Sequence, residues 1–499
     1  MKAASFKVNL AVVLFALGTV VLLAGCHGRG NGGVTSGGGP VPVTLTVHDT
    51  PSSNIAVTSF EATITGAVLQ PGNVSLLSAP GQAVELTQLQ TNSTILSTTN
   101  VATGTYNSLT LTYSSPQYTI FNNSGSTLTI FGKTCGALQS CVVTPRVSGT
   151  LTETISTPPF PVSLGSSSQT LLEVDVDLNS IIQSDFSVDF SASGAMTANI
   201  QQVTSGTVVI GSLALNGAVT AVGTMPNQFS FMASTSQTFS NIAVTSSTQF
   251  AQFNQSARGL NCTANDFTCL AVNQIVDVQL QILGNGKFQA TEVDLDDAPS
   301  TQQVSGTIVA LTGGTPPTGF QMVVHNTDPA LTSLPPGTPV TVTVSTSPSP
   351  IFLINDGLFV LPSGSFNFAS AGDLLVGQEV EARVSGTVTA GPPATFTADR
   401  FALGQTQFNG NVASVSNPNF FVNFASLPTI FVSPITQVQV VTTTQTLFQT
   451  QPTGSLTDVS ALIGQPPGDV FVGGFLFNSS NAQVPNVAGV TVRQKVPGT

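Results

Sequence analysis

The segment VTLTVHD (residues 43–49) alternates apolar Val and Leu with polar Thr and His. A strand points successive side chains to opposite faces, so this alternation predicts a β-strand with one apolar face. Comparable runs recur along the chain: FEATITGAVL (60–69), SLTLTY (108–113), VTVTV (340–344) and VQVV (438–441). Helical periodicity lasts for no more than one turn, in GDLLVGQEV (372–380) and TDVSALIG (457–464). The sequence therefore predicts an all-β protein.

The composition restricts both the location and the partners of this protein. Of 499 residues, 41% are apolar and only 7% are charged, against about 25% in an ordinary soluble domain. Ser, Thr, Asn and Gln must therefore supply most of the solubility, which is typical of an extracytoplasmic β protein. The net charge of −12 without basic clusters repels phosphate backbones, so we exclude nucleic acid as a partner. The length predicts several domains.

The first residues have the parts of a bacterial export signal. Lys2 and Lys7 precede an apolar core, and the segment ends in Leu-Ala-Gly before Cys26. This ending resembles the lipobox of bacterial lipoproteins. The resemblance implies cleavage after residue 25, lipid on Cys26, and a membrane partner through that lipid. We expect a protein of the cell envelope, anchored on its periplasmic or cell-surface side.

Residues 26–40 are rich in glycine, and we interpret them as a flexible tether. An uncleaved membrane helix over residues 1–25 is the alternative. The tether also contains a GxGxxG pattern at residues 28–33. No strand precedes it and no helix follows, so we predict no nucleotide cofactor.

Four further cysteines form two local groups, KTCGALQSC (133–141) and LNCTANDFTC (260–269). Three pairings of four cysteines exist, and adjacency favours Cys135–Cys141 and Cys262–Cys269. Disulfides of this kind are typical of an oxidising compartment. A four-cysteine zinc site is the alternative, although the CxxC spacing of such sites is missing.

Residues 41–205 contain a series of segments that resembles a known family. The segments are VTLTVHDTP (43–51), ITGAVLQ (64–70), VELTQLQ (84–90), GTYNSLTLTY (104–113) and LLEVDVDLNSII (171–182). Their order resembles the bacterial family named domain of unknown function 4382, which usually has Asp-Ala-Pro where this chain has Asp49-Thr50-Pro51. That family has no assigned activity, so the resemblance implies only a fold and a location. We expect a β-sandwich.

The remainder reads as three diverged copies of one module, over 216–296, 304–403 and 408–494. Each copy opens with a glycine in NGAVTAV (216–222), SGTIVAL (305–311) or NGNVASV (409–415), and a Phe-rich strand follows. This pattern resembles domain of unknown function 5666, whose members carry a small barrel in tandem. We expect three small β-barrel-like modules, arranged like beads on a string.

Two acidic runs alternate with apolar residues and are the candidate metal sites. A strand would place the acids of each run on one face, where crowded oxygen ligands suit Ca²⁺. The candidate ligands are Glu173, Asp175 and Asp177 in the first run, and Glu292, Asp294 and Asp296 in the second. Neither run has the DxDxDG loop, so we favour a solvated acidic sheet face and keep Ca²⁺ binding as the alternative.

No catalytic motif is present. His48 precedes Asp49, but adjacent strand residues point to opposite faces, and the chain has neither a GxSxG elbow nor an HExxH helix. We read His48 as a polar residue at a strand end. We expect no enzyme activity, and no pocket in which three polar side chains converge with a histidine or an acid pair among them.

The sequence thus predicts a non-catalytic, lipid-anchored cell-envelope protein with a structural, adhesive or spacer role. Its partner would be another envelope protein or a polysaccharide. The alternative is a surface module that binds Ca²⁺ or polysaccharide, and an envelope hydrolase is the less favoured reading. Trp is absent and the three Tyr all lie in the first domain, so the repeats lack the usual platforms for sugars.

Overall fold

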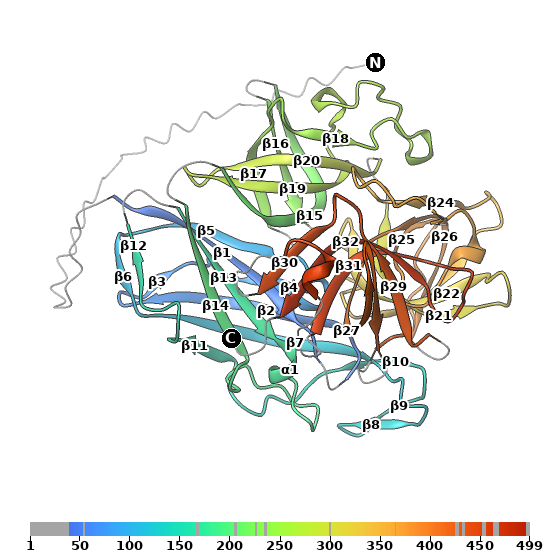
Figure 1. The fold of residues 1–499 in the computed structure, drawn as a ribbon, viewed down its shortest axis with the longest axis horizontal. Coiled ribbons are helices and arrows are strands. Elements are labelled where there is room, and N and C mark those ends of the chain that lie inside the picture. Colours follow the sequence, from blue (N-terminus) through green and yellow to red (C-terminus); the bar gives the residue numbers. More distant parts are fainter. Residues whose placement is uncertain are drawn as a thin grey trace, which may run out of the picture. The chain divides into compact units, whose positions relative to one another are not determined.

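The computed structural model describes residues 39–52, 55–165, 169–203, 207–224, 227–233, 237–298, 301–364, 366–424, 429–431, 435–451, 456–462 and 469–495. Strands hold 54% of the residues and helices 5%, which confirms the all-β prediction (Figure 1). The predicted signal, Cys26 and nearly all of the tether lie outside the described residues. Within the described ranges, no helix combines the length and the apolarity that crossing a membrane requires.

The sandwich domain (residues 41–203) consists of two sheets around one hydrophobic core, blue to green in Figure 1. The first sheet has the order β14-β13-β1-β5, with β1 (Val41–Thr50), β5 (Thr94–Val101), β13 (Gln169–Asp177) and β14 (Met196–Val203). The second contains β2 (Val57–Gln70), β3 (Val74–Ser75), β4 (Gln82–Glu85), β7 (Ser108–Phe121), β10 (Ser140–Val143) and β11 (Thr152–Ile155). Smaller elements are η1 (Leu86–Leu89), β6 (Gly104–Tyr106), β8 (Leu128–Ile130), β9 (Lys133–Cys135), β12 (Val162–Leu164) and α1 (Leu178–Ile181).

Both faces of β1 are buried, although its sequence alternates. Val43, Leu45 and Val47 belong to the sandwich core. The polar residues between them, Thr46 and His48, are also withdrawn from solvent. The opposite face is covered because the C-terminal part of the chain packs on it, through Arg493 against His48.

Three modules follow, and their strands are ordered alike. Module 1 (207–297) has β15 (Thr207–Thr224), β16 (Asn227–Ala233), β17 (Thr238–Ala243), β18 (Gln249–Ala251), β19 (Ile275–Leu283) and β20 (Phe288–Asp297). Module 2 (303–403) has β21 (Gln303–Thr312), β22 (Gly319–Asp328), β23 (Pro339–Val344), β24 (Ile351–Ile354), β25 (Glu379–Val384) and β26 (Ala394–Leu403). Module 3 (406–495) has β27 (Thr406–Ser416), β28 (Asn419–Asn423), β29 (Gln437–Val441), β30 (Leu447–Gln451), β31 (Asp469–Phe477) and β32 (Asn486–Lys495). The short helices are η2 (Ser256–Arg258), η3 (Phe267–Cys269), η4 (Ala371–Asp373) and η5 (Val459–Leu462).

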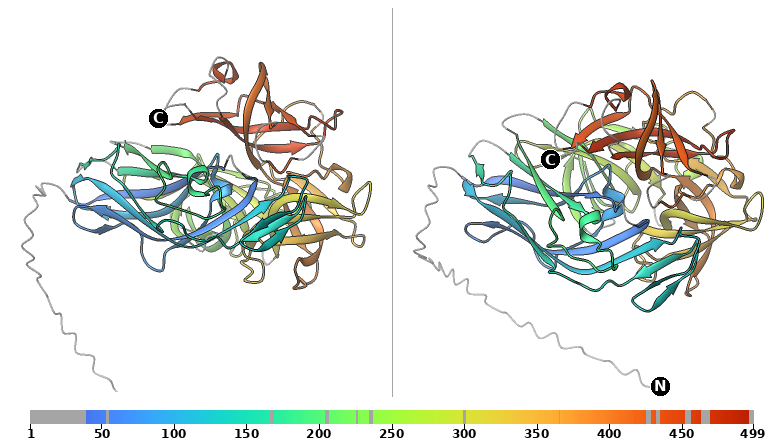
Figure 2. Two further views of the ribbon diagram at one scale, coloured as in Figure 1. Left: turned by 90° about the horizontal axis from the view of Figure 1, so that it is seen from below. Right: turned by 60° about the horizontal axis from the view of Figure 1, so that its bottom comes forward.

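Each module is a closed barrel, as predicted (Figure 2). Five strands form the barrel, and the remaining strand, β18, β24 or β30, pairs in parallel with the last strand of its module. In module 1 the strands β15, β16 and β17 are joined as hairpins, and β19 returns beside β15, which is a Greek key. A parallel contact between β17 and β20 closes the barrel, and β23–β26 and β29–β32 repeat it in the other modules.

A steric constraint requires a glycine at the start of each module. A Cβ atom on Gly217 or Gly306 would run into a backbone carbonyl oxygen of the second strand, at Met232 or Val323. A Cβ on Gly410 would run into the side chain of Val422. The second strand therefore approaches the first too closely for any side chain, and only glycine fits there.

The modules are not arranged like beads on a string. Residues 36–499 form one compact unit, which corrects that expectation. Phe475 and Phe477 of module 3 share a hydrophobic cluster with module 2, and Ile95 and Leu171 of the sandwich share one with module 1. Apolar residues on the outer faces of the barrels are buried by these contacts, which the repeat pattern could not reveal.

Both predicted disulfides are present. Cys135–Cys141 joins the end of β9 to β10, with 5.9 Å between the two Cα atoms. Cys262–Cys269 closes the loop that contains η3, with a Cα separation of 5.6 Å. Each bond therefore closes a local loop, and neither links two domains.

A buried ion pair joins modules 1 and 2. Arg400 of β26 contacts Asp297 at the end of β20, and both side chains are almost fully withdrawn from solvent. Gln303 also donates to the Asp297 carboxylate, at 3.0 Å. Breaking such a pair is costly because the remaining charge stays buried without its partner.

We expect Arg400→Met to lower the free energy of unfolding by about 3–5 kcal/mol. The matched control is Arg383→Met, because Arg383 pairs with Asp399 at 2.8 Å but is 26% exposed. An exposed pair of this kind contributes about 1 kcal/mol or less. Urea unfolding of both variants measures the difference, and equal losses would contradict a structural role for the Arg400–Asp297 pair.

Candidate cation site

Carboxylates line a cavity of about 480 Å³ between the sandwich domain and the modules. The acids on its wall are Glu61, Glu85, Asp277, Glu292, Asp294, Asp356, Glu379 and Glu381. Among the described residues that line it, His325 is the one side chain able to carry a positive charge. The cavity is therefore a region of strongly negative potential.

Three of the acids near this cavity converge, and we call them the carboxylate triad: Asp277 of β19, Asp296 of β20 and Glu381 of β25. One oxygen from each lies within 4.8 Å of the others. Asn216 donates its side-chain N–H to Asp277 at 2.9 Å and to Asp296 at 3.1 Å. Asn355 donates to the second oxygen of each, at 3.1 and 3.3 Å. The two amides thus hold Asp277 and Asp296 side by side.

The barrel register explains why two different modules contribute to the triad. In each module the opening glycine pairs with a valine: Gly217 with Val276, Gly306 with Val380 and Gly410 with Val470. The residue after that valine is Asp277 in module 1 and Glu381 in module 2. These two acids therefore occupy equivalent positions of the repeat, and the packing of the two modules brings them together.

Arg258 is the internal counter-ion of the triad. It is 1% exposed, and it donates to the carbonyl oxygens of Leu295 and Asp296 at 2.6 and 2.7 Å. Its guanidinium lies 3.7 Å from the Asp296 carboxylate and donates to Asn355 at 3.2 Å. One guanidinium cannot balance three ionised carboxylates.

Burial, and after it the repulsion between the acids, changes the protonation of the site. Burial raises the pKa of Asp277 to about 7, with a further contribution from the charge of Asp296, against the opposing effect of the two amides and Arg258. Burial, followed by the charge of Asp296 and a hydrogen bond with it, raises the pKa of Glu381 well above its usual range. Burial also raises the pKa of Asp294. These three acids therefore retain their protons to higher pH than exposed carboxyl groups do.

Two carboxylate oxygens near the triad have no hydrogen-bond partner among the described residues. Asp294, cross-strand neighbour of Asp277, is 5% exposed, and its Oδ1 lacks a partner while its Oδ2 accepts from Gln252 at 3.2 Å. The Oε2 atom of Glu381 is likewise buried without a partner. Buried oxygens of this kind are rare in folded proteins and call for an explanation.

The second acidic run thus has a different environment from the one favoured on sequence grounds. Asp294 and Asp296 are buried, so the solvated acidic face is wrong for them. Asp296 joins the triad, whereas Glu292 accepts from the backbone N–H of Leu358 at 3.1 Å. Strand alternation could not reveal Asp277 and Glu381 as partners, because Asp277 is the one acid of β19 and Glu381 lies in β25 of another module. The available signal was the alternation of Glu379 and Glu381 in β25, which has the same spacing as the acids of the second run.

The first acidic run does not converge. Ser93 donates to Glu173 at 2.7 Å, and Asp177 caps α1 through the backbone N–H of Asn179 at 2.9 Å. Asp175 is buried and contacts His48 at 3.1 Å. Burial alone would raise the pKa of Asp175, but His48, Arg493 and Thr50 together lower it. These acids hold the fold together, and the solvated face is wrong for Asp175 as well.

His48 is a buried part of a network, which sequence reasoning missed. Arg493 of β32 donates to its Nδ1 atom at 2.9 Å and to the carbonyl oxygen of Gln90 at 2.9 Å. The partner lies 445 residues away along the chain, so no local pattern could indicate it.

His325 contradicts the expectation that no pocket gathers a histidine with acids. Its Nδ1 atom lies 3.1 Å from Glu379, and its Nε2 atom lies 2.8 Å from the carbonyl oxygen of Thr58 in the sandwich domain. Burial alone would lower its pKa, but Glu379, Glu85 and the Thr58 carbonyl together raise the pKa to about 9. Both ring nitrogens are thus engaged, Nδ1 within module 2 and Nε2 in the contact that joins module 2 to the sandwich domain.

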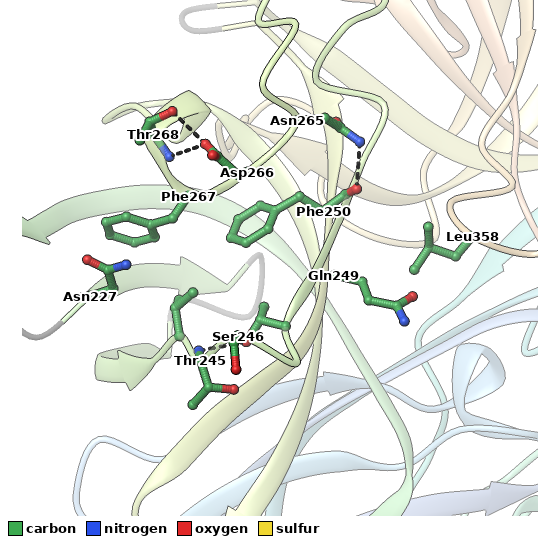
Figure 3. Close-up of a pocket in the computed structure, with 12 residues that line it drawn as sticks. Asn227, Thr245, Ser246, Gln249, Phe250, Asn265, Asp266, Phe267, Thr268 and Leu358 are labelled. Atoms are coloured by element: carbon green, nitrogen blue, oxygen red, sulfur yellow. Dashed lines mark hydrogen bonds between the residues drawn. The ribbon is translucent and has the colours of Figure 1, made fainter.

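A second, open groove of about 690 Å³ lies on module 1 (Figure 3). Phe250 and Phe267 contribute its apolar part. Its polar groups are engaged locally: Asp266 accepts from the backbone N–H of Thr268 at 2.9 Å, and Asn265 donates to the carbonyl oxygen of Phe250 at 2.8 Å. The acidic cavity is the better candidate site because it leaves buried polar atoms without partners.

The raised pKa of His325 predicts a pH dependence of stability. The protonated ring contributes its full stabilisation below pH 6.5, the ordinary pKa, and loses it as the pH rises through about 9. We expect His325→Gln to cost on the order of 3 kcal/mol at pH 6 and far less at pH 10. Urea unfolding of both proteins across this range measures the difference. A difference that does not change with pH would contradict the Glu379 and Glu85 assignment.

Comparison with known proteins adds a family for the first domain. No curated protein matches the chain. Residues 41–206, which include the whole sandwich domain, match the family described as domain of unknown function (DUF4382).

Proposed function

We propose that this chain is a non-catalytic, lipid-anchored protein of the bacterial cell envelope with a structural or adhesive role, and that it binds a divalent metal ion in its acidic cavity. The carboxylate triad is the observation that supports ion binding: three acids from two modules lie within 4.8 Å of one another. The lipid anchor rests on the Leu-Ala-Gly-Cys26 ending of the export signal.

Electrostatics support a metal ion more than any other ligand. Metal binding releases the protons of its ligands, and the three ionised carboxylates beside Arg258 then leave two negative charges, which a divalent cation balances. Carboxylate oxygens are the ligands that hard cations such as Ca²⁺ and Mg²⁺ take. A neutral polysaccharide would bring no charge to this wall, and a phosphate-bearing ligand would be repelled from it.

The contacts of the polar residues support a non-catalytic role. A general base needs a free lone pair within reach of a substrate proton. Both nitrogens of His325 already contact protein groups, and His48 is buried against Arg493. The packing of the modules on the sandwich domain suits a rigid body that presents one fixed surface from its lipid anchor.

The anchor is tested by metabolic labelling with a fatty acid. The wild-type protein is expected to take up label and to fractionate with membranes. Cys26→Ala removes the attachment atom and is expected to abolish labelling, whereas Cys135→Ala, which opens a disulfide, is expected to retain it. A labelled Cys26→Ala protein would contradict the anchor.

Ion binding is tested on the full chain after treatment with a chelator. Dialysis against a mixture of Ca²⁺, Mg²⁺ and Mn²⁺ is expected to leave at least one divalent ion bound per chain, and binding is expected to raise the melting temperature by mass action. A chain that retains no divalent ion, and whose melting temperature is unchanged by any of them, would overturn this part of the proposal.

A further inference from the structure

The geometry points to a Ca²⁺ site in which Asp277 and Asp296 of module 1 and Glu381 of module 2 hold the ion jointly, so that the metal ties the two modules together. This inference rests on the proposed function and deepens it, because it names the ion, its ligands and its structural consequence.

The oxygen count of the triad suits calcium. Ca²⁺ takes six to eight oxygen ligands, water among them, and the triad supplies one converging oxygen from each of its three carboxylates. The Asn216 and Asn355 amides each donate one hydrogen bond to Asp277 and one to Asp296. An ionised carboxylate has about four lone-pair directions, so both aspartates keep free acceptor capacity.

A buried acid outside the triad points to a ligand beside it. Asp294 is 5% exposed, lines the same cavity wall, and has one oxygen without a partner. The Oε2 atom of Glu381 in the triad is also buried and without a partner. A bound cation and the waters around it would give both oxygens a partner. Without one, each buried acceptor costs about 1–3 kcal/mol.

The rigid placement of the ligands favours Ca²⁺ over Mg²⁺. Mg²⁺ demands nearly ideal octahedral geometry at about 2.0–2.1 Å, whereas Ca²⁺ accepts irregular geometry at about 2.3–2.6 Å. The three acids stand on strands β19, β20 and β25 of two barrels, and the amides fix two of them. Ligands held in this way cannot contract around the smaller ion.

Equilibrium dialysis of the full chain with radioactive ⁴⁵Ca²⁺, after chelator treatment, tests the site. Asp277→Asn and Glu381→Gln keep the shape of the side chain and remove its charge. Each is expected to weaken Ca²⁺ binding by at least about tenfold, the lower end of the loss that even an outer-shell partner of a metal produces. Glu61→Gln is the matched control, because Glu61 lines the same cavity from β2 and is not in the triad.

Melting curves without metal show whether each variant folds, and a folded variant that gains no thermal stability from Ca²⁺ supports the site. Undiminished Ca²⁺ binding in both triad variants would overturn the inference and leave the proposed function standing. Mg²⁺ binding as tight as that of Ca²⁺ would overturn the choice of ion. Absence of binding by any divalent ion would overturn both proposals.

Discussion

Burial of charge at the contacts between domains is the constraint on which this structure depends. A buried ion is tolerated only when a partner of opposite charge and further hydrogen bonds surround it. The chain has only 11 basic residues and 23 acids, and several of them lie at these contacts. Arg400 joins modules 1 and 2, Arg493 joins module 3 to the sandwich domain, and His325 joins module 2 to the sandwich domain. A low charge content is therefore compatible with a precise arrangement of domains.

Local patterns in the sequence were sufficient for the elements of the fold. Alternating Val and Thr predicted the strands, the recurring glycine predicted the modules, and close spacing predicted the disulfides. Each of these signals depends on neighbours along the chain. The contacts between modules depend on neighbours in space, and so the same reasoning placed the modules apart when they in fact pack together.

The carboxylate triad shows at the level of single residues that local patterns do not reveal contacts between distant parts of the chain. The alternation at 292–296 correctly placed Asp294 and Asp296 on one face of a strand, and so found one member of the triad. Asp277 is the only acid in IVDVQLQIL, and Glu381 lies over a hundred residues further on. Their approach follows from how two barrels pack, which neither strand encodes alone. The burial of these acids was missed for the same reason.

The repeat position of Asp277 in module 1 and Glu381 in module 2 holds a different kind of residue in module 3. Phe471 stands there, and its cross-strand neighbour Arg493 occupies the place that Asp294 has in module 1. The Arg493 guanidinium lies 5.9 Å from the centre of the Phe471 ring and reaches His48. The position that carries an acid in modules 1 and 2 thus carries Phe471 in module 3, and the neighbour of Phe471, Arg493, supplies the cation for the sandwich contact.

The meeting of Asp277 with Glu381 has a consequence for symmetry. In an isologous homodimer, a residue that contacts its own counterpart lies at the twofold axis. In a true homodimer every substitution appears on both sides of the axis at once, so a carboxylate there always faces its copy. Fusion of the copies into one chain removes that restriction. The two halves can then diverge separately, and they have done so: one side carries Asp and the other Glu, and Asp296 has joined from one side alone.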